Sequence, residues 1–256
     1  MNQSHIRTSL HELSPSFNFT HLCVILAQRT MSDLPTVILV PGNGCTNISK
    51  ANWYVSDATH VYSFELLSSL PNSYTSRRSI SFPLVFLEEL IRYWWVSKEI
   101  KALGFPVKCE TFPDPYEAKE SVWLPFIHDE LANGSDNIIL IGHSSGAEAS
   151  MRYLEKYKVV GAILVSACWT DLDEPSETIS GYYGRPWLWQ EMVSNSQWIL
   201  QFGSADDPFI PIEEMRHVAS EIGTDYIEYT SHGHFMTKTF PELLEHFKRK
   251  VAGSNN

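Results

Sequence analysis

A serine in a glycine-flanked turn is the strongest indication of chemistry in this sequence. Ser144 lies in Gly142-His143-Ser144-Ser145-Gly146, which fits the pattern G-x-S-x-G, between an apolar strand-like run and a helix-like run. Such a turn strains the backbone of its serine, and small residues two positions away relieve the crowding. The pattern predicts a nucleophile at a helix start, where free N–H groups favour a developing oxyanion. The alternative is a strand–turn–helix joint without chemistry.

A serine hydroxyl needs a base, and after this kind of turn an acid and then a histidine are expected further along the chain. The apolar run Trp198–Gly203 ends in a loop that carries Asp206 and Asp207 before Pro211. We favour Asp207 as the acid that orients the histidine, and Asp206 as a residue that braces the turn. Both could also be turn residues only, since Asp is common in loops.

The histidine should follow the next strand. His234, in Gly233-His234-Phe235, comes after the run Tyr226–Tyr229 and 27 residues after Asp207, which leaves room for one helix and one strand. His232 is the rival, and we expect it behind the site or at the surface. Order and placement together predict a triad of Ser144, Asp207 and His234.

Two backbone N–H groups should bind the oxyanion. One is that of Ser145, the residue after the nucleophile. The other should come from the loop Pro41-Gly42-Asn43-Gly44, whose glycines let the backbone approach a substrate closely. We choose Asn43, with Gly44 as the alternate.

Strands and helices must alternate to position these loops. Apolar runs that end in Gly- or Ser-rich loops predict strands at Thr36–Pro41, Asn137–Gly142, Gly161–Ala167 and Trp198–Gly203, with shorter ones at Val107–Phe112 and Tyr226–Tyr229. Helical patterns occur at Lys98–Leu103, Ser121–Leu131, Ala147–Tyr157, Glu213–Ile222 and Pro241–Val251. The alternation predicts an α/β fold: a central, mostly parallel sheet with helices on both faces, in a minimal single domain.

Composition excludes several other classes of protein. The 256 residues carry a net charge of −11 without a basic stripe, which argues against nucleic acid as a partner. The longest apolar stretch, Leu22–Ala27, is too short to span a bilayer. Four scattered cysteines without a C-x-x-C pair indicate neither a zinc site nor a disulfide framework, and favour a cytoplasmic, or also nuclear, location. No phosphate loop, dinucleotide fingerprint or metal-ligand cluster is present in the sequence, so we expect no cofactor and no metal.

Three regions flank or interrupt the domain pattern. Residues 1–33 read as a disordered extension, with a targeting peptide as the alternative, and residues 253–256 as a tail. The domain proper is predicted over 34–252, with an insertion at 55–94 where a short loop and one helix would suffice. The insertion could be a lid or a partner-binding excursion, but we favour a poorly ordered or peripheral segment.

Several motifs in one order resemble a known family. They are Pro41-Gly42-Asn43-Gly44, Phe112-Pro113-Asp114-Pro115, Glu120–Phe126, Gly142–Gly146, Ser180–Trp187, Gly203–Pro211 and Gly233-His234-Phe235. The chain resembles the retinoblastoma-binding protein 9 family, small serine hydrolases of the α/β-hydrolase superfamily, over Thr36–Trp53 and Trp95–Ala252. The resemblance implies an α/β-hydrolase-like fold, the same triad, and hydrolysis of small esters or amides with aminopeptidase-like activity. The motif L-x-C-x-E is absent from the chain, which argues against binding to retinoblastoma-type pocket proteins through it.

The segment Cys168–Met192 lies where such hydrolases cover their pocket. We select Tyr182, Tyr183 and Trp187 as substrate-pocket candidates, although aromatic residues here could serve as core packing. A cleft that they line would favour apolar or aromatic groups. The sequence thus predicts a monomeric serine hydrolase that acts on small esters or amides through an acyl-enzyme. A non-catalytic interaction scaffold is the alternative, and an acyltransferase shares the same chemistry.

Overall fold

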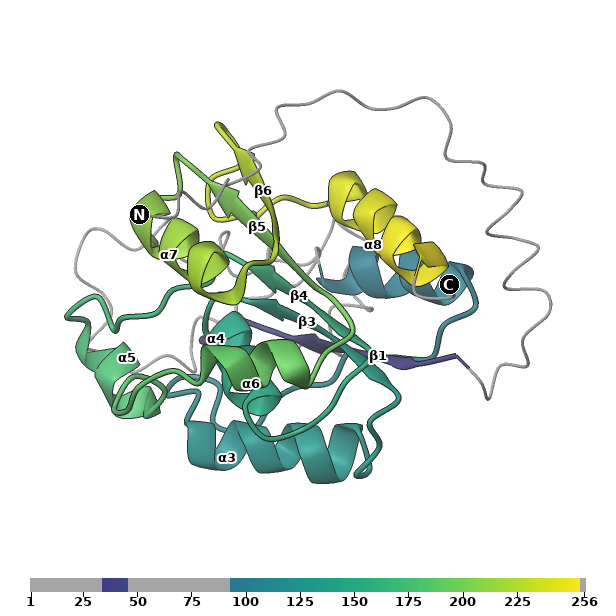
Figure 1. Ribbon diagram of the computed structural model, residues 1–256, viewed down its shortest axis with the longest axis horizontal. Coiled ribbons are helices and arrows are strands. Elements are labelled where there is room, and N and C mark those ends of the chain that lie inside the picture. The colour runs from purple at the N-terminus through teal and green to yellow at the C-terminus, as the bar shows by residue number, and fades with distance from the viewer. Residues whose placement is uncertain (1–33, 46–92, 254–256) are drawn as a thin grey trace, which may run out of the picture.

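A computed structural model describes residues 34–45 and 93–253 of the chain, and in this part the strands form one sheet (Figure 1). The sheet order is β2-β1-β3-β4-β5-β6, and every neighbouring pair is parallel. The strands are β1 (Thr36–Val40), β2 (Val107–Lys108), β3 (Ile138–His143), β4 (Gly161–Val165), β5 (Ile199–Ser204) and β6 (Asp225–Tyr229). The predicted α/β class is confirmed.

Helices cover both faces of this sheet. They are α3 (Glu120–Pro125), which continues into a π-helical stretch at Phe126–Leu131, then α4 (Ser145–Leu154), α5 (Pro175–Ser180), α6 (Trp189–Ser194), α7 (Ile212–Ile222) and α8 (Pro241–Gly253). Residues 93–102 are also helical. Figure 1 shows α8 beside residues 93–102 on one side of the sheet, with α3, α4 and α6 on the other. None of the helices within the described ranges combines the length and apolar character needed to cross a membrane.

Alternate residues of the central strands enter two different cores. In β1, Val37 and Leu39 pack toward residues 93–102 and α8, whereas Ile38 and Val40 pack toward α3 and α4. Successive side chains of a strand point to opposite faces, so a strand covered on both faces must be apolar throughout. This explains the unbroken apolar runs in the sequence, which made the strand positions predictable.

Four predicted segments differ in extent or lie mostly outside the described residues. Only Val107–Lys108 of the run predicted at Val107–Phe112 pairs in the sheet, as the edge strand β2 beside β1. The predicted extension at 1–33, residues 254–256 of the tail, and most of the predicted insertion lie outside the described residues. The last two insertion residues, Tyr93 and Trp94, belong to the helix at 93–102, and Tyr93 is buried.

The parallel arrangement brings the predicted site residues to one edge. The carboxyl ends of parallel strands meet on the same side of a sheet, where loops gather ligand-binding groups. Asn43 follows β1, Ser144 follows β3, Asp207 follows β5 and His234 follows β6. Four segments that are distant in the chain therefore contribute to one region.

Candidate active site

The turn between β3 and α4 holds Ser144 in a rare backbone conformation. Ser144 has φ 54° and ψ −130°, in the positive-φ region that non-glycine residues seldom adopt. Its N–H donates to the Val165 carbonyl oxygen at 2.9 Å, which ties the turn to β4. A side chain at Gly146 would collide with the carbonyl oxygens of Val40 and Pro41, so the turn depends on a glycine there.

Asp207 and His234 form a buried acid–imidazole pair. His234 Nδ1 lies 2.8 Å from Asp207 Oδ2 and 3.1 Å from Oδ1, and the Asp207 side chain is fully buried. A carboxylate accepts, so this contact places the proton on Nδ1 and leaves Nε2 of a neutral ring as the acceptor. Burial opposes ionisation of Asp207, but hydrogen bonds from His234 and from the N–H groups of Ile210 and Phe209 hold its pKa below the ordinary value.

Asp206 has a different set of contacts. Its Oδ1 accepts from the Ser204 hydroxyl at 2.6 Å and from the Gly233 N–H at 2.8 Å. The Ser204 hydroxyl oxygen in turn accepts the His232 N–H at 2.9 Å, and the His232 ring stacks on Tyr229. Asp206 and His232 therefore brace the loop that carries His234, and Asp207 is the aspartate that meets the imidazole.

A hydrogen-bonded chain holds the histidine loop against the serine turn. His143, directly before Ser144, has Nε2 2.9 Å from the His234 carbonyl oxygen and Nδ1 2.8 Å from Tyr93 Oη. A carbonyl only accepts, so Nε2 carries the proton and Tyr93 donates to Nδ1. Tyr93 Oη also accepts the Gly42 N–H at 3.0 Å. Sequence reasoning missed both His143 and Tyr93, because neither position is marked by its residue type.

Ser144 and His234 lie on adjoining loops. The rings of His143 and His234 are 4.6 Å apart between centroids, which places His234 next to the serine turn. Among the described contacts, no hydrogen bond joins the Ser144 hydroxyl to the His234 imidazole. In many enzymes that bond tightens only in the substrate complex. The structure thus joins Asp207 to His234 directly, and brings Ser144 near them through His143.

The backbone donors of the loop after β1 are largely occupied. The Gly42 N–H donates to Tyr93, and the Gly44 N–H donates to the Pro115 carbonyl oxygen at 2.6 Å. Within the described part of the chain, no acceptor takes the Asn43 N–H. Ser145 is the first residue of α4, where N–H groups have no acceptor within the helix. In this loop, the described residues thus leave the N–H of Asn43, and not that of Gly44, without an acceptor.

Glu177 of α5 contacts the side chains of Asn43 and Ser145. Its Oε1 accepts from Asn43 Nδ2 at 3.0 Å and from the Ser145 hydroxyl at 3.5 Å, and its Oε2 accepts from the Tyr183 hydroxyl at 3.5 Å. Burial raises the pKa of this carboxyl above its ordinary value. No motif in the sequence marks Glu177, which lies inside the segment predicted to cover the pocket.

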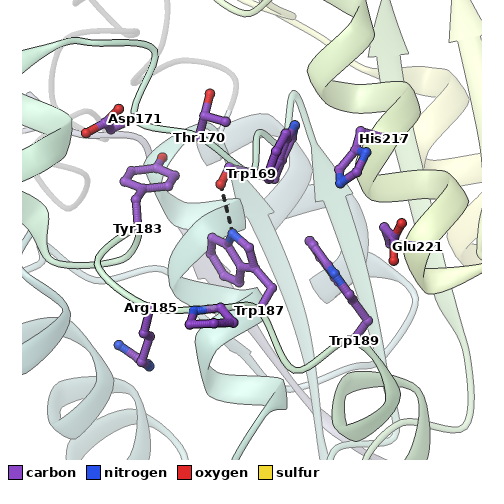
Figure 2. A pocket seen from close by; sticks show the side chains of 10 residues that line it. Trp169, Thr170, Asp171, Tyr183, Arg185, Trp187, Trp189, His217 and Glu221 are labelled. Atoms are coloured by element: carbon purple, nitrogen blue, oxygen red, sulfur yellow. Dashed lines mark hydrogen bonds between the residues drawn. The ribbon is translucent and has the colours of Figure 1, made fainter.

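Tyr183, which contacts Glu177, also lines an aromatic pocket of about 550 Å³ (Figure 2). It is lined by Trp169, Thr170, Asp171, Tyr183, Arg185, Pro186, Trp187, Trp189, His217 and Glu221. Trp187 Nε1 donates to the Trp169 carbonyl oxygen at 2.8 Å, and the Trp187 indole stacks near that of Trp189. Tyr183 and Trp187 thus line the pocket, whereas Tyr182 is fully buried in the core and does not. Within the described ranges, no three His, Cys, Asp or Glu side chains are grouped to hold a metal ion.

A family model described as "Serine hydrolase" matches residues 94–248. The chain belongs to the serine hydrolase family. The serine hydrolase RBBP9 of Rattus norvegicus is 44% identical over 161 residues, which cover 62% of this chain and 86% of that protein. The family resemblance is confirmed, and the matched range spans the positions of Ser144, Asp207 and His234.

Solved structures support the fold of this serine hydrolase. The ydeN gene product of Bacillus subtilis superposes with a TM-score of 0.60 at 17% identity, and covers 85% of this chain and 99% of its own. The esterase RhEst1 from Rhodococcus sp. ECU1013 has a TM-score of 0.50 at 13% identity, with 89% and 93% covered. At these identities the likeness shows the α/β-hydrolase fold alone.

Proposed function

We propose that this serine hydrolase cleaves small esters or amides through an acyl-enzyme formed on Ser144. The observation that carries the proposal is the buried Asp207–His234 pair on the loops beside a serine with a strained, positive-φ backbone. An ionised Asp207 that accepts from Nδ1–H keeps Nε2 unprotonated, and this nitrogen can take the serine proton.

The proposed reaction has two halves. His234 removes the Ser144 proton as Oγ attacks the carbonyl carbon, and the imidazolium then gives that proton to the leaving alcohol or amine. Water, activated by the same imidazole, hydrolyses the acyl-enzyme and restores the serine. The N–H groups of Asn43 and Ser145 stabilise the oxyanion in both halves, and such a donor typically contributes about 2.7–4 kcal/mol to transition-state stabilisation.

The substrate preference is the finer part of the proposal. The pocket lined by Tyr183, Trp187 and Trp189 favours an apolar or aromatic group on the substrate. Together with the family resemblance, this supports aminopeptidase-like hydrolysis of small substrates with such side chains. The alternative, an interaction scaffold that retains an idle triad, predicts no turnover by a folded protein.

A fluorophosphonate probe separates these two functions. We expect the wild-type protein to be labelled, and Ser144→Ala to lose the labelling completely because the attacking oxygen is gone. Ser150→Ala is the matched control, since Ser150 is buried on α4 and, among the described residues, its hydroxyl bonds only the Gly146 carbonyl oxygen. Absence of labelling in folded wild-type protein would favour the scaffold. Labelling that survives Ser144→Ala would show that the nucleophile lies elsewhere.

A further inference from the structure

Glu177 occupies a position between the proposed oxyanion donors and the aromatic pocket. One carboxylate oxygen contacts the side chains of Asn43 and Ser145, and the other contacts the Tyr183 hydroxyl. Tyr183 itself lines the pocket. Glu177 therefore contacts both the residues of the proposed oxyanion donors and a residue of the pocket wall, where a substrate that spans the two would meet this carboxylate.

Within the described residues, the contacts of Glu177 leave its negative charge without a balancing cation. All three hydrogen-bond donors are neutral groups: an amide and two hydroxyls. Among the described residues, no lysine, arginine or histidine forms an ion pair with Glu177. A partly buried carboxylate without a cation gains more from a bound cation than an exposed one does, because water screens it less. The position thus favours a positively charged group on the substrate.

We propose that Glu177 binds the protonated α-amino group of an aminoacyl ester or amide, with the side chain of that residue in the aromatic pocket. This inference rests on the proposed function and names the recognition element of the same site. In an α-aminoacyl substrate, the amine is attached to the carbon next to the reacting carbonyl. The ammonium group is therefore held close to the oxyanion donors, within reach of a carboxylate that touches the side chains of both. Glu177 would then select for a free amino terminus.

A matched pair of substrates tests the charge directly. L-phenylalanyl-7-amido-4-methylcoumarin carries the ammonium group, and 3-phenylpropionyl-7-amido-4-methylcoumarin has the same shape without it. We expect wild-type enzyme to prefer the first by kcat/KM. Glu177→Gln keeps the size and an acceptor oxygen but removes the charge, and should lower this preference about 10- to 100-fold, the usual range for a charge-assisted hydrogen bond. Glu130→Gln removes an exposed carboxylate that has no described contact with Glu177, and should leave the preference unchanged.

Each outcome bears on one claim. If Glu177→Gln lowers kcat/KM equally for both substrates, the preference is unchanged and the carboxylate only positions Asn43 and Ser145. That result overturns the inference, and so does a variant with the kcat/KM values of wild type. Both outcomes leave the proposed function standing, because the wild-type enzyme still turns over substrate. Wild-type protein that hydrolyses neither amide, and takes no fluorophosphonate label, would instead overturn the proposed function and this inference with it. Far-UV circular dichroism and fluorophosphonate labelling of the variants verify that they fold.

Discussion

Two adjacent aspartates in one loop have separate tasks at the residue scale. Asp207 meets the imidazole of His234, whereas Asp206 binds the Ser204 hydroxyl and the Gly233 N–H. Asp207→Asn should lower kcat about 10³- to 10⁴-fold, because an amide that donates to the imidazole favours the wrong tautomer. Hydrolysis of p-nitrophenyl acetate measures this loss.

Asp206→Asn is the matched control for that substitution. It keeps an acceptor oxygen for Ser204 and Gly233, so we expect kcat to fall less than about tenfold. A factor of about ten corresponds to the free energy of one neutral hydrogen bond. A loss as large as that of Asp207→Asn would contradict the division of tasks between the two residues.

Residue types and their order predicted the candidate triad, but not the contacts that position it. Ser144, Asp207 and His234 each follow a strand-like run, which the sequence displays. His143 and Tyr93 become important only because the fold brings together partners 50 and 91 positions apart. The choice between Asp206 and Asp207 likewise depends on side-chain direction in an irregular loop, which no periodicity records.

At the scale of elements, the crossing of β1 and α4 depends on a glycine. A Cβ at Gly146 would overlap the carbonyl oxygens of Val40 and Pro41 at the end of β1. Gly146→Ala should therefore force the helix away from the strand and reduce the free energy of unfolding by about 1–3 kcal/mol, as overpacking of a tight interior does. Urea denaturation measures the change. Gly184→Ala serves as control, since Gly184 is exposed and a methyl group there meets no atom within 4 Å; similar losses in both variants would contradict the steric argument.

The buried strands and the longer helices were predictable from the sequence, whereas the short helices α5 and α6 were not. The buried strands β1, β3, β4 and β5 appear as apolar runs because both of their faces are covered. Helices α5 and α6 were missed; each has six residues, and helices this short owe their stability to tertiary contacts rather than to their own sequence. Met192 of α6, for example, is fully buried in the core beside α4.

On the scale of the whole molecule, one buried carboxyl joins helix α4 to the segment that leads into the pocket. Glu148 of α4 is 1% exposed, and its Oε1 accepts the Cys168 N–H at 2.7 Å. Cys168 lies beyond β4, directly before Trp169 of the aromatic pocket. Burial raises the pKa of Glu148 well above 4.5, and the nearby Glu177 acts in the same direction.

This raised pKa should make global stability depend on pH in a defined direction. The folded protein binds the Glu148 proton more tightly than the unfolded chain does, so the resulting stability is complete below the unfolded pKa and is lost as pH rises through the folded pKa. Glu148→Gln cannot lose that proton, and its amide oxygen can still accept from Cys168. From pH 4.5 upward, the free energy of unfolding of wild type should therefore fall relative to that of Glu148→Gln, by at most about 1.4 kcal/mol per pH unit.

Urea denaturation across this range measures the difference, with the exposed Glu130→Gln as control. Curves for wild type and Glu148→Gln that stay parallel would mean that Glu148 has the same proton affinity in the folded and unfolded chains.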